Sequence, residues 1–290
     1  MKIIAVAGYK KKVFLGIEQA NIIKKCIKEN NSWENNYRLG MLWIDNCRYI
    51  RFYQNYYIQF DVSSKAARRC FFRALRKSPQ NPRVLAAIGW SYMVHCPRPD
   101  YIKIKRFFEM AYESAPREPF YAWCMLAVTY MSGKYEKLCS EPPRIPQIDP
   151  VIFFLSQITY TFAFVQQNKC ERAKAILTSI KPDIFCQMSA SDEAVWTLIE
   201  AYYCIGEMES AWEIYITNQA GKMMIGSPCR KYFEEDGEET VSDYMKNRKE
   251  ILKYFNPLRM IRWWDYLVGR SMDDLKDEYL LSKLPSGGCT

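Results

Sequence analysis

Apolar residues near the end of the first quarter of the chain recur at steps of three and four. Between residues 63 and 77 these positions are Ala67, Cys70, Phe71, Ala74 and Leu75. Residues three and four apart lie on the same side of an α-helix, so the pattern predicts an amphipathic helix with a basic opposite side. Ser63 or Ser64 is expected to cap its start, and Pro79 and Pro82 to end it.

Several other stretches have the same helical spacing. Residues 84–94 are small and apolar around Gly89, which suits close packing against a second helix. Residues 17–28 predict a further helix, after which Ser32 can cap the aromatic-rich stretch of residues 33–60. We expect Gly40 or residues 45–46 to divide that stretch into two helices.

The helices on either side of Pro79 resemble the two halves of a tetratricopeptide repeat. The pattern A-x3-F-x2-A-x4-P from Ala67 to Pro79 resembles the second helix of that family, and L-x2-I-G-x2-Y from Leu85 to Tyr92 resembles the first. Both patterns return 37 or 38 residues later, at residues 108–116 and 123–130. Residues 133–136 resemble the turn inside a repeat, but Pro142, Pro143 and Pro146 cut the next helix short.

Further units follow along the chain. Residues 151–180 form a partial unit, and residues 195–215 form a clearer one. The predicted fold class is all-α, and the resemblance implies a right-handed tetratricopeptide-like solenoid of helical hairpins with extra N- and C-terminal helices. We expect an N-terminal helical or irregular segment at 1–48, an array of about five degenerate repeats at 49–220, and an acidic loop with C-terminal capping helices at 221–290.

The C-terminal part is expected to close the array. Three helices are predicted there, at about 240–254, 256–268 and 272–282. Trp263 and Trp264 are expected to cover the open end of the stack, because the last repeat of a solenoid needs a cap. The run EEDGEE at residues 234–239 is expected to be a solvated loop.

Composition agrees with a folded helical protein. Hydrophobic residues make up 49% of the 290 residues, and only 12 are Gly and 14 are Pro, which disfavours disorder and a turn-rich β fold. The 11 cysteines show no C-x-x-C pair, a usage typical of a reducing compartment. The short apolar start is followed by lysines, and no apolar run reaches the ~20 residues of a membrane span. We therefore expect a cytoplasmic protein with no signal peptide and no membrane contact.

The net charge of +9 is unevenly distributed. Residues 1–80 carry a net charge of +11, and residues 181–290 carry −6. The densest basic patch consists of Arg68, Arg69, Arg73, Arg76 and Lys77. Such a patch can attract an acidic protein or nucleic acid, although solvated helix faces also favour Lys and Arg.

Catalytic chemistry is poorly represented in the sequence. His95 is the single histidine, which excludes a histidine metal cluster within one chain, and no phosphate-binding loop or nucleophile elbow is present. A cysteine paired with His95 is conceivable, but buried structural cysteines are the simpler interpretation. We expect no enzymatic activity, cofactor or metal.

The resemblance implies a concave groove, lined by the first helices of the repeats, that takes up a peptide or helix of a partner. The residues that the register places there are Arg83, Trp90, Met93, Tyr121, Met131, Trp196, Glu200 and Tyr203. Their aromatic and Met side chains could anchor a partner, or could instead pack between neighbouring repeats. Basic groove residues that clamp a terminal carboxylate in this family are not recognisable.

Residues 49–93 also resemble the beginning of the tetratricopeptide region that follows winged-helix domains in some bacterial transcription activators and the catalytic domain of some class III adenylate cyclases. Residues 1–48 are too short for either domain. We therefore expect a regulator or scaffold that binds another protein, with its basic N-terminal third attracting acidic partners. The alternative is binding of single-stranded RNA, with Tyr53, Tyr56 and Tyr57 stacking on bases beside the basic patch.

Overall fold

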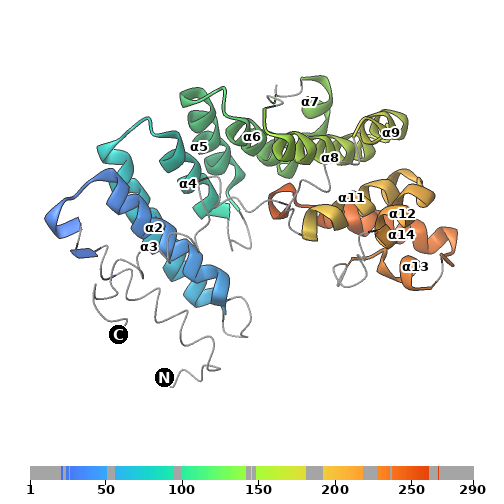
Figure 1. Cartoon of the computed structure of the whole chain (residues 1–290), viewed down its shortest axis with the longest axis horizontal. Helices are drawn as coiled ribbons and strands as arrows, with labels where there is room; N and C mark the ends of the chain where they lie inside the picture. The colour runs from blue at the N-terminus through green and yellow to red at the C-terminus, as the bar shows by residue number, and fades with distance from the viewer. Residues whose placement is uncertain are drawn as a thin grey trace, which may run out of the picture. The chain divides into compact units, whose positions relative to one another are not determined.

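The computed structural model describes residues 21, 24–25, 27–50, 56–93, 99–141, 145, 148–180, 192–217, 227–235, 237–260 and 267. Every regular element within these ranges is a helix, so the predicted all-α class is confirmed (Figure 1). The chain separates into two compact units, Met1–Ala115 with Trp264–Thr290, and Pro116–Trp263. No helix in the described part is both long and apolar enough to cross a bilayer.

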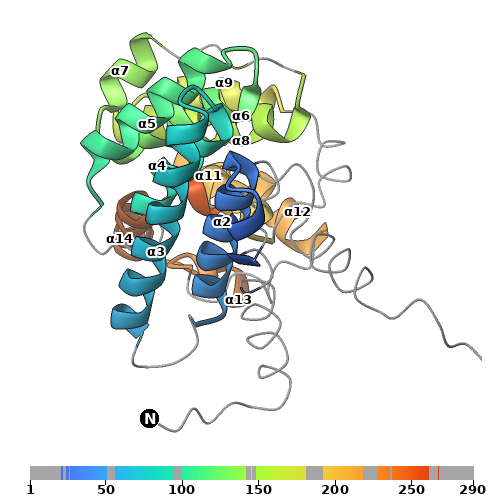
Figure 2. The ribbon, with the colours of Figure 1, turned by 90° about the vertical axis from the view of Figure 1, so that its left-hand side faces the viewer.

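Residues 33–114 of the first unit form four helices in succession. They are α2 (Trp33–Ile50), α3 (Tyr56–Lys77), α4 (Pro82–Met93) and α5 (Tyr101–Ser114). Each helix packs against the next, and α2 and α3 lie side by side (Figure 2). The expected Ser32 cap is confirmed, because its Oγ accepts from the backbone N–H of Asn35 at 3.2 Å.

Two expectations about these helices are wrong. The helix α2 is continuous from Trp33 to Ile50, with Gly40 inside it rather than at a break. The helix α3 begins at Tyr56 and runs through Ser63 and Ser64, neither of which caps it. Long contact between α2 and α3 explains both, since tertiary packing outweighs local preferences for a break or a cap.

The same close contact occurs in both helix pairs of this unit. A Cβ atom placed on Gly40 would lie 2.4 Å from the Phe71 ring, and one placed on Gly89 would lie 2.6 Å from the Phe108 ring. Both phenylalanines are fully buried. Each pair therefore depends on a glycine in its first helix to admit an aromatic ring from its second.

The second unit contains a further series of helices among its described residues. They are α6 (Pro119–Met131), α7 (Tyr135–Ser140), α8 (Pro150–Gln166), α9 (Cys170–Thr178), α11 (Asp192–Ile205), α12 (Met208–Thr217), α13 (Arg230–Glu234), α14 (Val241–Tyr254) and the 3-10 turn η2 (Pro257–Arg259). The helix α8 packs against α6, α7, α9 and α11. The short α7 agrees with the expected interruption by proline.

Three turns in this unit share one backbone geometry. Gly133, Asn168 and Gly206 have positive φ angles of 71°, 56° and 84°. In each turn the next residue donates its N–H to the carbonyl five residues earlier, as Lys134 does to Thr129 at 3.3 Å. This is the Schellman arrangement that ends a helix and turns the chain back. The expected turn at residues 133–136 is thus confirmed.

The domain boundaries expected near residues 48 and 220 fall within these two units, and the division into five repeats stays a prediction. The predicted helix at 240–254 is confirmed as α14. Trp263, Trp264 and the helix expected at 272–282 lie outside the described residues, as does most of the helix expected at 256–268.

Candidate interaction surfaces

The exposed side of α3 is strongly basic. Residues 64–93 contain seven Lys and Arg residues and no Asp or Glu. We define the basic face of α3 by its exposed side chains, which are Lys65, Arg69, Phe72, Arg73, Arg76 and Lys77. Arg69, Arg73 and Arg76 are four and three residues apart, so they lie in a row along one side of the helix.

An aromatic side chain interrupts this row of cations. Phe72 retains 37% of its surface exposed, and its ring meets the edge of Phe107 from α5 at 6.0 Å between centroids. Phe107 in turn stacks on Tyr92 at 6.1 Å with an angle of 14° between the rings. Phe72 is therefore the accessible end of an aromatic cluster that spans α3, α4 and α5.

Arg68 differs from the other predicted patch residues because it is half-buried and already engaged. Its Nη1 donates to the Ser91 carbonyl at 2.6 Å, and its guanidinium lies 4.8 Å from the centre of the Tyr92 ring. These contacts tie α3 to α4. The structure therefore places four of the five predicted basic residues on the exposed face and gives the fifth a packing contact.

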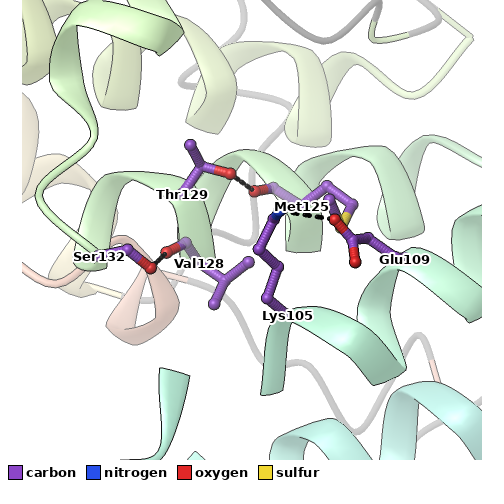
Figure 3. A network of polar contacts seen from close by, with 6 residues as sticks. All are labelled: Lys105, Glu109, Met125, Val128, Thr129 and Ser132. Atoms are coloured by element: carbon purple, nitrogen blue, oxygen red, sulfur yellow. Dashed lines mark hydrogen bonds and ion pairs between the residues drawn. The ribbon is translucent and has the colours of Figure 1, made fainter. Parts of the chain in front are cut away.

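The carboxylates at the start of α5 and in its middle are paired with lysines of the same segment. Asp100 pairs with Lys103 at 2.9 Å, and this contact raises the pKa of the exposed Lys103 ammonium. Glu109 pairs with Lys105 at 2.7 Å (Figure 3). Asp100 and Glu109 are thus each engaged by a lysine of their own segment.

The eight predicted groove residues fall into three classes of exposure. Arg83 is exposed, Met131 and Trp196 are half-buried, and the others, Trp90, Met93, Tyr121, Glu200 and Tyr203, are buried. The Trp90 ring packs on Phe108 at 6.0 Å between centroids. Packing is thus the observed role of Trp90, and a groove lined by these residues stays a prediction.

Met131 lies at the C-terminal end of α6. The hydroxyls of the neighbouring Thr129 and Ser132 form hydrogen bonds with backbone carbonyls of the same helix. The Thr129 hydroxyl donates to the Met125 carbonyl, and the Ser132 hydroxyl donates to the Val128 carbonyl, both at 2.7 Å (Figure 3). The hydroxyl protons are therefore used within the helix, while each hydroxyl oxygen can still accept a further hydrogen bond.

A buried polar network joins α11 to the segment that follows it in the second unit. The Ser227 hydroxyl donates to the Glu200 carboxyl at 2.5 Å, and Ser227 Oγ lies 3.3 Å from Cys229 Sγ. Burial raises the pKa of Glu200 to about 7, although the Ser227 hydroxyl and the Trp196 indole beside it lower it in part. Burial and the nearby Glu200 charge also raise the pKa of the Cys229 thiol.

The same network continues along α11 to α14. The Tyr203 hydroxyl donates to Glu239 at 2.7 and 2.6 Å, and Asn247 donates to the same carboxylate at 2.6 Å. Arg248 Nε donates to the Cys204 carbonyl at 2.8 Å. Glu239 therefore holds two side chains together, so the expectation that residues 234–239 form only a solvated loop is wrong at this position.

Sequence reasoning did not identify Ser227, Glu239 or Arg248 as partners of α11, or Asn247 as a partner of Glu239. The hydrogen bonds of Ser227, Glu239 and Arg248 with α11 span 27 to 44 residues, and no local pattern indicates contacts of that separation. The network is dense in thiols, hydroxyls and carboxylates, but every described member is engaged in packing or hydrogen bonding. Within the described residues, the network connects α11 with residues 227–229 and with α14.

Other expected chemistry falls partly outside the described residues. His95 and Tyr53 lie outside them, and the side chains of Tyr56 and Tyr57 are not described. Among the described residues, no group of three or more His, Cys, Asp or Glu side chains is arranged to hold a metal ion.

Comparison with known proteins leaves the family open. No protein-family model matches the sequence, and no curated protein is significantly similar to it.

Proposed function

We propose that this chain is a non-enzymatic binding protein that holds an acidic segment of a partner protein on the basic face of α3. The observation that carries this proposal is the stretch of residues 64–93, which contains seven cations and no carboxylate. Solvated helix faces usually interleave both signs of charge, as α5 does. A one-signed face attracts a partner of the opposite sign and speeds its encounter.

The wider architecture supports a tetratricopeptide-like solenoid. The glycine–phenylalanine contact occurs in two successive helix pairs, and the turns at Gly133, Asn168 and Gly206 are equivalent. Repeated hairpins of this kind provide extended surfaces for partners. None of the six cysteines with described side chains forms a disulfide bond, which is in keeping with a reducing, cytoplasmic location. On this basis, we propose a scaffold or regulatory role.

Single-stranded nucleic acid is the second candidate, and the aromatic contacts disfavour it. Base stacking needs accessible ring faces. Tyr92 contacts both Arg68 and Phe107, and Phe72 alone of this cluster is classed as exposed. The cations of α3 also suit phosphate groups. Binding measurements with an acidic peptide and with a nucleic-acid strand therefore distinguish the two classes of partner.

A charge-reversal experiment tests the proposal. We expect the triple variant Arg69→Glu, Arg73→Glu and Arg76→Glu to bind a fluorescein-labelled glutamate-rich peptide at least about tenfold more weakly than the native chain, measured by fluorescence anisotropy at low salt. The control reverses three exposed cations of the second unit, Lys134, Lys137 and Lys169, and should leave the affinity nearly unchanged.

Two results would contradict the proposal. One is equal peptide binding by the native chain and the α3 variant, with both showing the same helical circular dichroism. The other is salt-sensitive binding of a labelled 12-nucleotide uridine strand with no binding of the acidic peptide, which favours the nucleic-acid candidate.

A further inference from the structure

We infer that the partner segment is an acidic amphipathic helix that lies along α3, with its carboxylates opposite Arg69, Arg73 and Arg76 and an apolar side chain against Phe72. This inference rests on the proposed function and specifies the conformation of the partner. The surface involved is the basic face of α3, which contains none of the eight groove residues predicted from the repeat register.

The exposed row is on the side of α3 that the first unit leaves uncovered. Ala67, Phe71 and Ala74 are fully buried, and the cations Arg69, Arg73 and Arg76 follow them by two residues. Two residues correspond to about 200° around a helix, so the two sets lie on opposite sides. The row therefore faces away from the packing within the unit.

The spacing of the cations matches a helix better than an extended chain. With a rise of about 1.5 Å per residue, Arg73 and Arg76 lie about 6 and about 10.5 Å along the axis from Arg69. Carboxylates at i, i+4 and i+7 of a second helix repeat these distances. Alternate residues of a strand are about 6.6 Å apart, so the third of them lies about 13.2 Å from the first. That is about 3 Å more than the distance along α3 from Arg69 to Arg76.

Phe72 supplies the apolar part of the contact. A phenylalanine with 37% of its surface exposed lies between Arg69 and Arg73 in the sequence and is supported from behind by Phe107. Covering its ring removes apolar surface from water, which ion pairs alone do not do. A helix with one apolar residue among its carboxylates satisfies both features of this face.

Peptides of one composition test the inference. The first 18-residue peptide places Glu at i, i+4 and i+7 with Leu at i+3, and the second has the same residues in an order that scatters Glu around the helix. We expect the native chain to bind the first at least about fivefold more tightly by anisotropy, with increased helical circular dichroism on binding. A central Ala→Pro substitution in the first peptide should abolish this advantage, because proline breaks the helix.

A complementary charge swap provides a second measurement. A peptide with Lys in place of Glu should bind the variant Arg69→Glu, Arg73→Glu, Arg76→Glu and not the native chain. Phe72→Ala should weaken binding of the ordered acidic peptide about threefold or more and leave the scattered peptide unaffected. Ile102→Ala, at an 85% exposed position of α5, is the matched control and should have no effect.

The outcomes separate this inference from the proposed function. Equal affinity for ordered, scattered and proline-containing peptides, together with loss of all binding in the arginine variant, overturns the helical partner and retains an acidic one. Binding unaffected by the arginine substitutions overturns both. Self-association of the native chain that the arginine variant abolishes, seen by analytical ultracentrifugation without peptide, identifies a second copy as the occupant and also overturns the inference.

Discussion

The helices α3 and α11 carry their charged residues in opposite ways. On α3, Arg69, Arg73 and Arg76 are exposed and no carboxylate lies within residues 64–93. On α11, Glu200 is buried and receives a hydrogen bond from Ser227. One helix presents charge to solvent, and the other encloses a carboxyl group within the packing of its unit.

The difference separates binding from stability. Exposed charges are screened by water and contribute from nothing to about 1 kcal/mol each, so their main effect is on encounters with a partner. A buried carboxyl loses its hydration when it ionises, so its protonation state affects the free energy of folding directly. A change of charge on α3 should therefore alter partner binding and leave the free energy of unfolding nearly unchanged. A change of charge at Glu200 on α11 should alter the free energy of unfolding.

The largest expected effect is a pH dependence of stability that originates at Glu200. Because burial raises its pKa from 4.5 to about 7, the folded state retains a proton that the unfolded chain releases between these values. The stabilising contribution is complete below about pH 4.5 and is lost as pH rises through 7, by about 3 kcal/mol in total. Urea unfolding of the native chain and of Glu200→Gln from pH 4.5 to 8 measures this difference.

Glu200→Gln should remove that component, because an amide does not titrate. The variant should be the more stable protein at pH 8 and close to the native chain at pH 5. Glu209→Gln, at an exposed position on α12, provides the control and should follow the native profile. Parallel profiles for the native chain and Glu200→Gln would contradict the assignment.

A smaller effect is expected at the hydroxyl groups that hold the network. Ser227→Ala removes the donor to Glu200, and Tyr203→Phe removes the donor to Glu239. Each should lower the free energy of unfolding by about 1–3 kcal/mol, since the acceptor is a carboxyl group left without that partner. Thermal and urea unfolding at pH 6 measure both losses. Ser114→Ala, which removes an exposed hydroxyl on α5, should change little.

Much of the fold could be predicted from the sequence because its cues are local. The spacing of Ala67, Phe71 and Ala74 identifies the buried side of α3, and all three are fully buried. Gly133 and Pro142 mark a turn and the short α7. The errors at Gly40 and Ser64 arose where a long contact with a neighbouring helix overrode a residue's local preference.

The polar network on α11 could not be predicted for a different reason. Glu200 and Tyr203 match first-helix positions of a repeat, where a groove is expected, yet residues 227–248 cover them in the second unit. Nothing near Ser227 or Arg248 in the sequence indicates that either residue contacts α11. A periodic pattern identifies the side of a helix that is covered or exposed, but not the identity of the segment that covers it.

The smallest expected effect distinguishes two neighbouring arginines of α3. Arg68→Ala loses the hydrogen bond to the Ser91 carbonyl and the contact with the Tyr92 ring, so we expect a loss of about 1–2 kcal/mol in stability. Arg69→Ala alters only an exposed side chain and should stay within about 0.5 kcal/mol of the native chain. Urea unfolding at neutral pH and moderate salt separates the two.

Binding of the acidic peptide should show the reverse order, with Arg69→Ala the weaker binder, because Arg69 faces the partner while Arg68 is engaged within the unit. Equal stability of the two variants would show that the contacts of Arg68 with Ser91 and Tyr92 add nothing to the free energy of unfolding. The distinction between a packed Arg68 and an exposed Arg69 would then be wrong.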